Sequence, residues 1–296
     1  MDDITDILKR VRKLEIRTRK LVRESFSGEY LSSFKGQGLD FDDFREYQAG
    51  DEPRFIDWNV TARTGVPHLR QFHEEREMNV LLVVDVSQSM DYGSRHISKR
   101  RLAAEVAALI AFSALRNGDK VGLCLFADQP IKFMAPRKGR VQGLRILKEI
   151  LSAEAPRQAP TSMPAVSQFL MNQLKRQSLV FMISDFLSDD FEKPLGVLSR
   201  KHDLVAIHTL DPAERELPDA GRITLRDPET GWLADVNSSN ANLRMAFQKL
   251  TQRQREGLRG LMARLQVDYA LLSTVGDYLP DLHKLFKSRG RRQFPS

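Results

Sequence analysis

The sequence predicts an α/β fold, built as a doubly wound, mostly parallel sheet with helices on both faces. Runs of β-branched residues and leucines, such as residues 80–84 and 179–183, are typical of strands buried on both faces. Stretches of helical periodicity alternate with these runs, which favours parallel strands joined by helices. With 296 residues, of which 41% are hydrophobic, the chain can form one large α/β domain with an appended segment, or two small domains.

The elements follow one another in a regular order from residue 79 onward. The first helix is expected at residues 98–116, because Leu102, Val106 and Leu109 share one face, and Asn117-Gly118-Asp119 stops it. By the same apolar patterns we expect further helices at 141–152, 164–176, 191–200, 240–265 and 278–287. Strands are expected at 79–84, 120–126, 131–134, 179–183, 203–210, 222–226, 231–236 and 267–272. Pro194 and Gly196 weaken the helix at 191–200.

The first 77 residues differ from this pattern. Residues 3–25 have apolar positions at helical spacing between basic side chains, so we expect an N-terminal helix that docks by its apolar stripe or, alternatively, contacts a partner or a membrane surface. Residues 26–77 mix glycine, aromatic and oppositely charged residues, which indicates an irregular, β-rich segment with paired charges. That network is either purely structural or a surface for a partner. We therefore divide the chain into residues 1–77, 78–290 and a basic tail, 291–296.

Composition restricts the function classes. Cys124 is the single cysteine, which excludes an intramolecular disulfide and is typical of a reducing compartment. No apolar run reaches the roughly 18–20 residues of a membrane span, and we expect a cytoplasmic protein. The net charge of +7 comes from the termini, since residues 1–23 carry +4 and residues 284–296 carry +5. The body of the chain is near −2, so any nucleic-acid binding would depend on the tails.

Three oxygen-bearing loops are predicted to converge at one edge of the sheet. Asp85, Ser87 and Ser89 follow the first buried strand in the spacing Asp-x-Ser-x-Ser, Asp185 follows the strand at 179–183, and Thr161 precedes a helix. In open α/β sheets ligands bind beyond the carboxyl ends of the strands. Hydroxyl and carboxylate oxygens suit a hard cation such as Mg²⁺, so we expect Mg²⁺, or else Mn²⁺ or Ca²⁺. The alternative for Asp85 and Ser87 is a helix cap or a turn, and Ser162 competes with Thr161 as the second-loop ligand.

Asp85, Ser87 and Ser89 resemble the first motif of the metal-ion-dependent adhesion site in von Willebrand factor A domains. That resemblance implies the second-loop role for Thr161 and the third-loop role for Asp185, within a sheet of von Willebrand factor A type. The wider chain, from about residue 25 to 275, resembles bacterial von Willebrand factor A-like proteins of the domain-of-unknown-function family 58. The stretches that carry this second resemblance are Gly36–Phe41, Arg45–Asp51, Ile56–Asn59, Ala62–Gly65, Ser184–Phe186, Asp211–Glu214 and Arg226–Gly231.

The family resemblance implies a partner and a role. Such proteins are encoded beside MoxR-type AAA+ ATPases, so we expect a metal-dependent protein-binding module that acts with such an ATPase in chaperone-like assembly or activation of clients. The metal would hold an acidic side chain of the client. Many family members have two membrane helices before this region, and this chain lacks them, which favours a soluble form.

An enzyme is the main alternative. Asp85 ends a buried strand, as the nucleophile of an Asp-x-Asp phosphatase does, but Ser87 stands where the second carboxylate is needed. No phosphate-binding loop and no set of nucleophile, base and orienting residue is found. We therefore expect a non-enzymatic protein, with a metal-dependent phosphoester hydrolase as the alternative and nucleic-acid binding through the basic termini as another. Asp211-Pro212 and Asp227-Pro228 are interpreted as turns, and His202 and His208 as structural.

Overall fold

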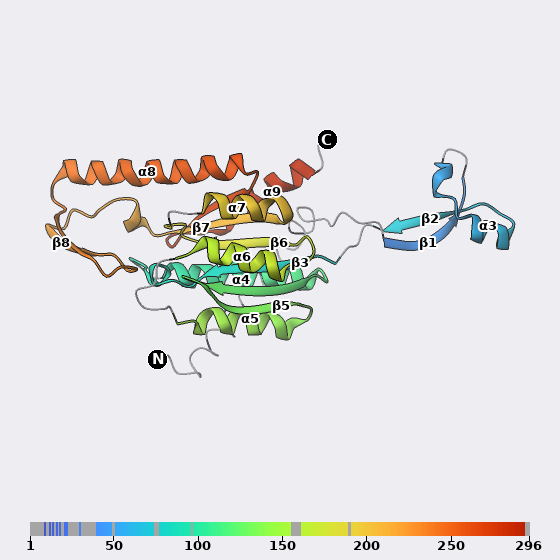
Figure 1. Cartoon of the computed structure of the whole chain (residues 1–296), viewed down its shortest axis with the longest axis horizontal. Coiled ribbons are helices and arrows are strands. Elements are labelled where there is room, and N and C mark those ends of the chain that lie inside the picture. Colours follow the sequence, from blue (N-terminus) through green and yellow to red (C-terminus); the bar gives the residue numbers. More distant parts are fainter. Residues whose placement is uncertain are drawn as a thin grey trace. The chain divides into compact units, whose positions relative to one another are not determined.

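The structure is a computed structural model of the chain (Figure 1). It describes residues 40–48, 51–73, 77–95, 97–154, 161–188 and 191–293, with isolated positions between 9 and 30. The chain divides into two compact units, residues 34–78 and residues 1–33 together with 79–296. The boundary at residue 78 lies one residue beyond the expected one. Residues 1–33, however, group with the larger unit, although the sequence-based division joined them to the 26–77 segment.

The larger unit contains a six-stranded sheet with the order β10-β7-β6-β3-β4-β5 (Figure 1). Its strands are β3 (Asn79–Asp85), β4 (Lys120–Phe126), β5 (Pro130–Arg137), β6 (Leu179–Ser184), β7 (Asp203–Leu210) and β10 (Asp268–Ser273). Five are parallel, and β5 runs antiparallel to β4 at one edge. The predicted mixed α/β class with a mostly parallel central sheet is confirmed.

Helices cover both faces of this sheet. Alternate strand residues such as Leu81, Val83 and Val180 face a core formed with α6 (Met163–Gln173), α7 (Glu192–Lys201) and α8 (Ala241–Arg264). On the opposite face lie α4 (Lys99–Arg116), α5 (Arg140–Ser152) and α9 (Leu279–Gln293). There Phe181 of β6 packs edge-on against Phe286 of α9, with ring centroids 6.4 Å apart. Such burial on both faces explains why the central strands are apolar throughout.

Two 3-10 helices lie at the carboxyl edge of the sheet, and a separate hairpin follows the second of them in the chain. The 3-10 helices η3 (Gln88–Asp91) and η4 (Pro212–Glu214) follow β3 and β7. The strands β8 (Arg222–Arg226) and β9 (Leu233–Asn237) pair in antiparallel fashion as a hairpin, which is a sheet of its own. The long helix α8 follows this hairpin, and its buried residues, Leu258, Leu261 and Met262, all lie near its C-terminal end.

The smaller unit, residues 34–78, is built from short elements. Its strands β1 (Asp40–Glu46) and β2 (His68–His73) are antiparallel, and between them lie η2 (Pro53–Phe55) and α3 (Trp58–Thr64). Asp57 begins α3 by accepting hydrogen bonds from the amides of Asn59 and Val60. Arg45 makes two hydrogen bonds of 2.7 Å to Asp51, so the expected short strands and paired charges are both present.

The expected N-terminal helix falls mostly outside the described residues. The described positions between 9 and 21 are helical, whereas Ile4, Ile7, Leu8 and Val11 are not described. At the other end, α9 continues to Gln293, three residues into the expected 291–296 tail. Among the described residues, no helix combines the length and the apolar character needed to span a membrane.

Candidate metal-binding site

The switch point of the sheet lies between β3 and β6. β3 pairs with β4 on one side and with β6 on the other, all in parallel, so the chain turns to opposite sides at their carboxyl ends. Asp85 is the last residue of β3, and Asp185 directly follows β6. The register pairs Val84 with Ile183, which places the two aspartates beyond adjacent strand ends. Crevices at such points are where open α/β sheets bind ligands.

The loop after β3 gathers three of the predicted oxygen donors. One carboxylate oxygen of Asp85 accepts the amide of Ser87 at 2.9 Å, and the other accepts the hydroxyl of Ser184 at 2.7 Å. The hydroxyls of Ser87 and Ser89 share a hydrogen bond of 3.0 Å. Asp85, Ser87 and Ser89 are all buried. Each oxygen of Asp85 thus accepts one hydrogen bond from the protein and keeps a lone pair for a cation or a water.

Asp85 carries an electrostatic cost in this position. Burial, and after it the nearby charge of Asp185, raise the pKa of the Asp85 carboxyl to about 7, although the hydrogen bonds from Ser184 and Ser87 oppose the shift. A carboxylate with a raised pKa is one whose charge lacks sufficient compensation from its surroundings. A bound cation would supply that compensation.

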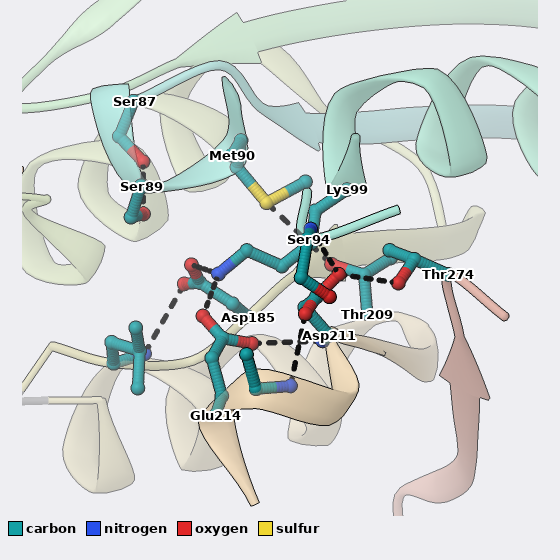
Figure 2. A network of polar contacts seen from close by, with 12 residues as sticks. Ser87, Ser89, Met90, Ser94, Lys99, Asp185, Thr209, Asp211, Glu214 and Thr274 are labelled. Carbon is teal, nitrogen blue, oxygen red and sulfur yellow. Dashed lines mark hydrogen bonds and ion pairs between the residues drawn. The ribbon is translucent and has the colours of Figure 1, made fainter. Parts of the chain in front are cut away.

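Asp185 is tied to a buried lysine (Figure 2). Lys99 is fully buried at the start of α4, and its ammonium contacts Asp185 at 2.7 Å and Glu214 at 2.5 Å. Burial opposes the charge of Lys99, but Asp185 and Glu214 outweigh that effect and raise its pKa. The other oxygen of Asp185 accepts only a long bond of 3.4 Å, from the amide of Leu187, among the described residues. One oxygen of Asp185 is thus committed to Lys99, and the second is available to a ligand.

Asp211 has a larger role than the turn that its Pro212 neighbour predicts. It does cap η4, because its carboxylate accepts the amide of Ala213 at 3.0 Å. It is also fully buried and accepts the amide of Ser94 at 2.9 Å and the hydroxyl of Thr274 at 2.7 Å (Figure 2). These bonds outweigh burial and lower its pKa. The turn that Asp211 caps directs Glu214 toward Lys99, so Asp211 helps to orient the ion pair between these two residues.

Thr161 faces the β8–β9 hairpin. Its hydroxyl donates to Oε1 of Glu229 at 2.8 Å, and its amide donates to Oε2 at 3.2 Å. The neighbouring Ser162 serves as the N-cap of α6, where its hydroxyl accepts the amide of Ala165. The sequence allows either Thr161 or Ser162 as the second-loop ligand. In the structure the hydroxyl of Thr161 points at the carboxylate of Glu229, whereas that of Ser162 caps a helix. No hydrogen bond joins Thr161 directly to Asp85, Ser87, Ser89 or Asp185 among the described residues.

A pocket of about 1250 Å³ opens beside these loops. Ser89 and Asp185 line it, together with the hairpin residues Thr224–Arg226 and with apolar side chains of α8. Arg226, Arg255 and Arg264 line it beside the acidic residues Asp91, Asp185, Glu192 and Glu214, and Arg264 is paired with Glu192 at 3.2 Å. The Nη1 atom of Arg255 is buried and bonds to none of the described residues. The pocket thus combines apolar side chains with one guanidinium nitrogen, that of Arg255, to which an acidic group could bind.

The donor set defines the kind of cation that fits. All five predicted residues offer oxygen, which suits Mg²⁺, Mn²⁺ or Ca²⁺. Within the described ranges, no group of three or more His, Cys, Asp and Glu is placed to hold a metal, so any site here depends on hydroxyls. Hydroxyls are weak ligands, and a cation bound through them keeps a position free for an external carboxylate. The residues fit a hard, exchangeable cation.

Sequence reasoning missed three residues of this region, namely Lys99, Glu214 and Glu229. Lys99 had a readable signal, because a cation in the first turn of a helix opposes the macrodipole and calls for an acidic partner. His208 has the structural contacts expected, since it is buried, its Nδ1 lies 2.7 Å from the hydroxyl of Tyr269, and burial lowers its pKa to about 4, but it also lines the pocket. Asp227 is a turn residue, as predicted, since it accepts the amides of the two residues after Pro228.

Comparison with known proteins gives a family and several relatives. The model of the family described as "Protein of unknown function DUF58" matches residues 43–257. The uncharacterized protein Mb1516 of Mycobacterium bovis is 31% identical over 283 residues, which cover 95% of this chain and 89% of that protein. The uncharacterized protein Rv1480 of Mycobacterium tuberculosis matches to the same extent.

Solved structures align more loosely. The conserved hypothetical protein BatB from Bacteroides thetaiotaomicron has a TM-score of 0.46 at 13% identity, and the alignment covers 72% of this chain and 99% of that one. An aerotolerance-related membrane protein from Bacteroides fragilis has a TM-score of 0.42 at 15% identity, with 73% and 99% covered.

Proposed function

The chain belongs to the DUF58 family of proteins of unknown function, and we propose that this member is a metal-dependent protein-binding module. In the proposal, Asp85, Ser87, Ser89, Thr161 and Asp185 hold a divalent cation, with Mg²⁺ as the first choice. The cation then binds an acidic side chain of a partner protein. The fold would be of von Willebrand factor A type, because the three donor loops occur in the order that this type uses.

The observation that carries the proposal is the state of Asp85. It is a fully buried carboxyl whose pKa burial raises to about 7, and it stands behind two serine hydroxyls 3.0 Å apart. A purely structural turn would not require a buried carboxylate next to Asp185. Metal binding explains the cost, since a cation would compensate both carboxylates while the hydroxyls leave it a free position.

The pocket supports a protein segment as the partner. Its volume of about 1250 Å³ and its apolar lining suit several side chains, and the buried Nη1 of Arg255 suits an acidic one. The resemblance of the sequence to proteins encoded beside MoxR-type AAA+ ATPases supports such an ATPase as the machine with which the module works. A client that offers a carboxylate would be the protein assembled or activated.

The first test measures metal binding. Titration of the purified protein with Mn²⁺ and Mg²⁺ should show binding to wild type, weakened by about 10-fold or more in Asp85→Asn. Asp277→Asn is the matched control, because it removes an exposed carboxylate that only caps the start of α9. Equal metal binding by Asp85→Asn and wild type would refute the metal site.

The second test measures the binding of a partner protein. A MoxR-type ATPase and its clients should be recovered by tagged wild type in Mg²⁺, and lost with chelator or with Asp85→Asn. Recovery that is equal under all three conditions would overturn metal-dependent binding. Metal-dependent turnover of a phosphoester panel by the pure protein would favour the hydrolase instead.

A further inference from the structure

The tip of the β8–β9 hairpin places an internal carboxylate on a predicted metal-binding loop. Glu229 accepts two hydrogen bonds from Thr161, one from the hydroxyl at 2.8 Å and one from the amide at 3.2 Å. The two residues lie 68 positions apart in the chain. A carboxylate gripped by two donors of one residue is held in a defined orientation.

The turn that presents Glu229 is internally braced. Asp227 accepts the amide of Glu229 at 2.9 Å and the hydroxyl of Thr230 at 2.6 Å. The backbone closes the turn as well, because the amide of Gly231 donates to the carbonyl of Asp227 at 2.9 Å, and Gly231 takes the positive φ of 75° that glycine permits. Glu229 is therefore delivered by a preformed turn that does not depend on Thr161 for its shape.

The loop of Thr161 is tied to the loop of Asp85 through β4. The amide of Ser162 donates to the carbonyl of Ala127 at 2.9 Å, just beyond the end of β4. The amide of Val86 donates to the carbonyl of Phe126 at 2.8 Å, one residue earlier. Two backbone bonds in succession thus fix the loop of Thr161 at the same sheet edge as Asp85, and Glu229 with it.

We propose that Glu229 is a built-in carboxylate ligand of this site, which occupies the place of the partner's acidic side chain until the partner displaces it. The inference rests on the proposed function and adds its regulation. Since Glu229 belongs to the same chain, its effective concentration at the site is high, and a partner must compete with it. A partner's apparent affinity is reduced by the fraction of molecules in which Glu229 is in place.

The hairpin links this displacement to the pocket. Thr224, Leu225, Arg226 and Pro228 of the hairpin line the pocket, and Glu229 is the next residue. Movement of the hairpin tip away from Thr161 would therefore change the wall of the pocket. The same movement would free the position that the carboxylate of Glu229 occupies at the metal site. The partner that fits is a segment with an acidic residue flanked by apolar ones, because the acid takes the place of Glu229 while the flanks fill the apolar lining.

The experiment titrates Mn²⁺ into the protein with and without excess acetate, a small carboxylate probe. Wild type should bind Mn²⁺ with an affinity that acetate does not change, since its carboxylate position is filled. Glu229→Gln should bind Mn²⁺ about 10-fold or more weakly, and acetate should restore most of the loss. Glu216→Gln, which removes an exposed carboxylate of the same type, should behave as wild type.

Two further variants distinguish the role of Glu229 from a folding effect. Thr161→Val should lower Mn²⁺ affinity without rescue by acetate, whereas Thr161→Ser should keep wild-type behaviour, and thermal melts would show that each variant folds. If Glu229→Gln binds Mn²⁺ as wild type does and ignores acetate, the built-in ligand is refuted while the metal site stands. If wild type binds no Mn²⁺, the proposed metal site fails and this inference fails with it.

Discussion

Replacing Asp85 with asparagine should change how the stability of the metal-free protein depends on pH. Asparagine has the shape of aspartate and can still accept the amide of Ser87, but it carries no charge. In wild type, burial raises the folded-state pKa of Asp85 from 3.8 to about 7. At Asp85 the folded state therefore binds more protons than the unfolded state between these values, so the contribution of this group to stability is lost as the pH rises from about 4 through 7.

The size of the effect follows from the pKa shift. A shift of about three units corresponds to about 4 kcal/mol, at roughly 1.4 kcal/mol per unit. Below about pH 4 both states of wild type are protonated, and Asp85→Asn should match it within about 1 kcal/mol. Above pH 7 the variant should be more stable by about 4 kcal/mol, which is roughly 8–16 °C in Tm for a domain of this size.

Urea unfolding in chelator from about pH 5 to about pH 8 covers more than half of this change. Mg²⁺ should then raise the stability of wild type more than that of the variant, because the variant binds the cation about 10-fold or more weakly. Parallel curves for the two proteins across this pH range would refute the buried, uncompensated state of Asp85. A variant that is less stable than wild type at every pH would also refute it.

Two further predictions concern neighbours of the site. Lys99→Met should lower the free energy of unfolding by about 3–5 kcal/mol, because Asp185 and Glu214 would lose a buried counter-charge. Urea unfolding measures the loss, and adding Glu214→Gln should recover part of it. No recovery in the double variant would show that the unpaired charge of Glu214 is not the cause. His208→Gln should flatten the acid side of the stability curve. Burial lowers the folded-state pKa of His208 from 6.5 to about 4, so this group alone costs wild type up to about 3 kcal/mol as the pH falls through this range. An equally steep acid limb in the variant would contradict this cause.

The fold could be predicted from the sequence where local pattern and burial agree. Strands 120–126 and 203–210 were expected at the residues where β4 and β7 lie, because a strand buried on both faces must be apolar throughout. The extent of β5, Pro130–Arg137, was underestimated, since an edge strand with exposed positions has no such run. Helix boundaries were less exact for the same reason: α9 extends beyond 287 on polar residues.

The candidate site was only partly predictable. Asp85 and Asp185 could be found because each directly follows a buried strand, where topology alone brings them to one edge. The contacts of Lys99 with Glu214 and of Thr161 with Glu229 join residues 115 and 68 positions apart. Such pairs depend on how loops and a hairpin pack in three dimensions, and a single sequence carries no periodic signal for them.

The grouping of the first 33 residues with the sheet has a practical consequence for dissecting this protein. Tyr30 is fully buried and donates its hydroxyl to Asp119 at 3.0 Å, and Arg116 donates to the carbonyl of Val22 at 3.1 Å. Residues 34–78 therefore interrupt a body to which the preceding residues belong. A truncation that begins after residue 78 would strip buried groups from that body. A break placed within 34–78, with both pieces co-expressed, would instead yield two fragments able to reassemble, which makes this segment the natural place to divide the chain.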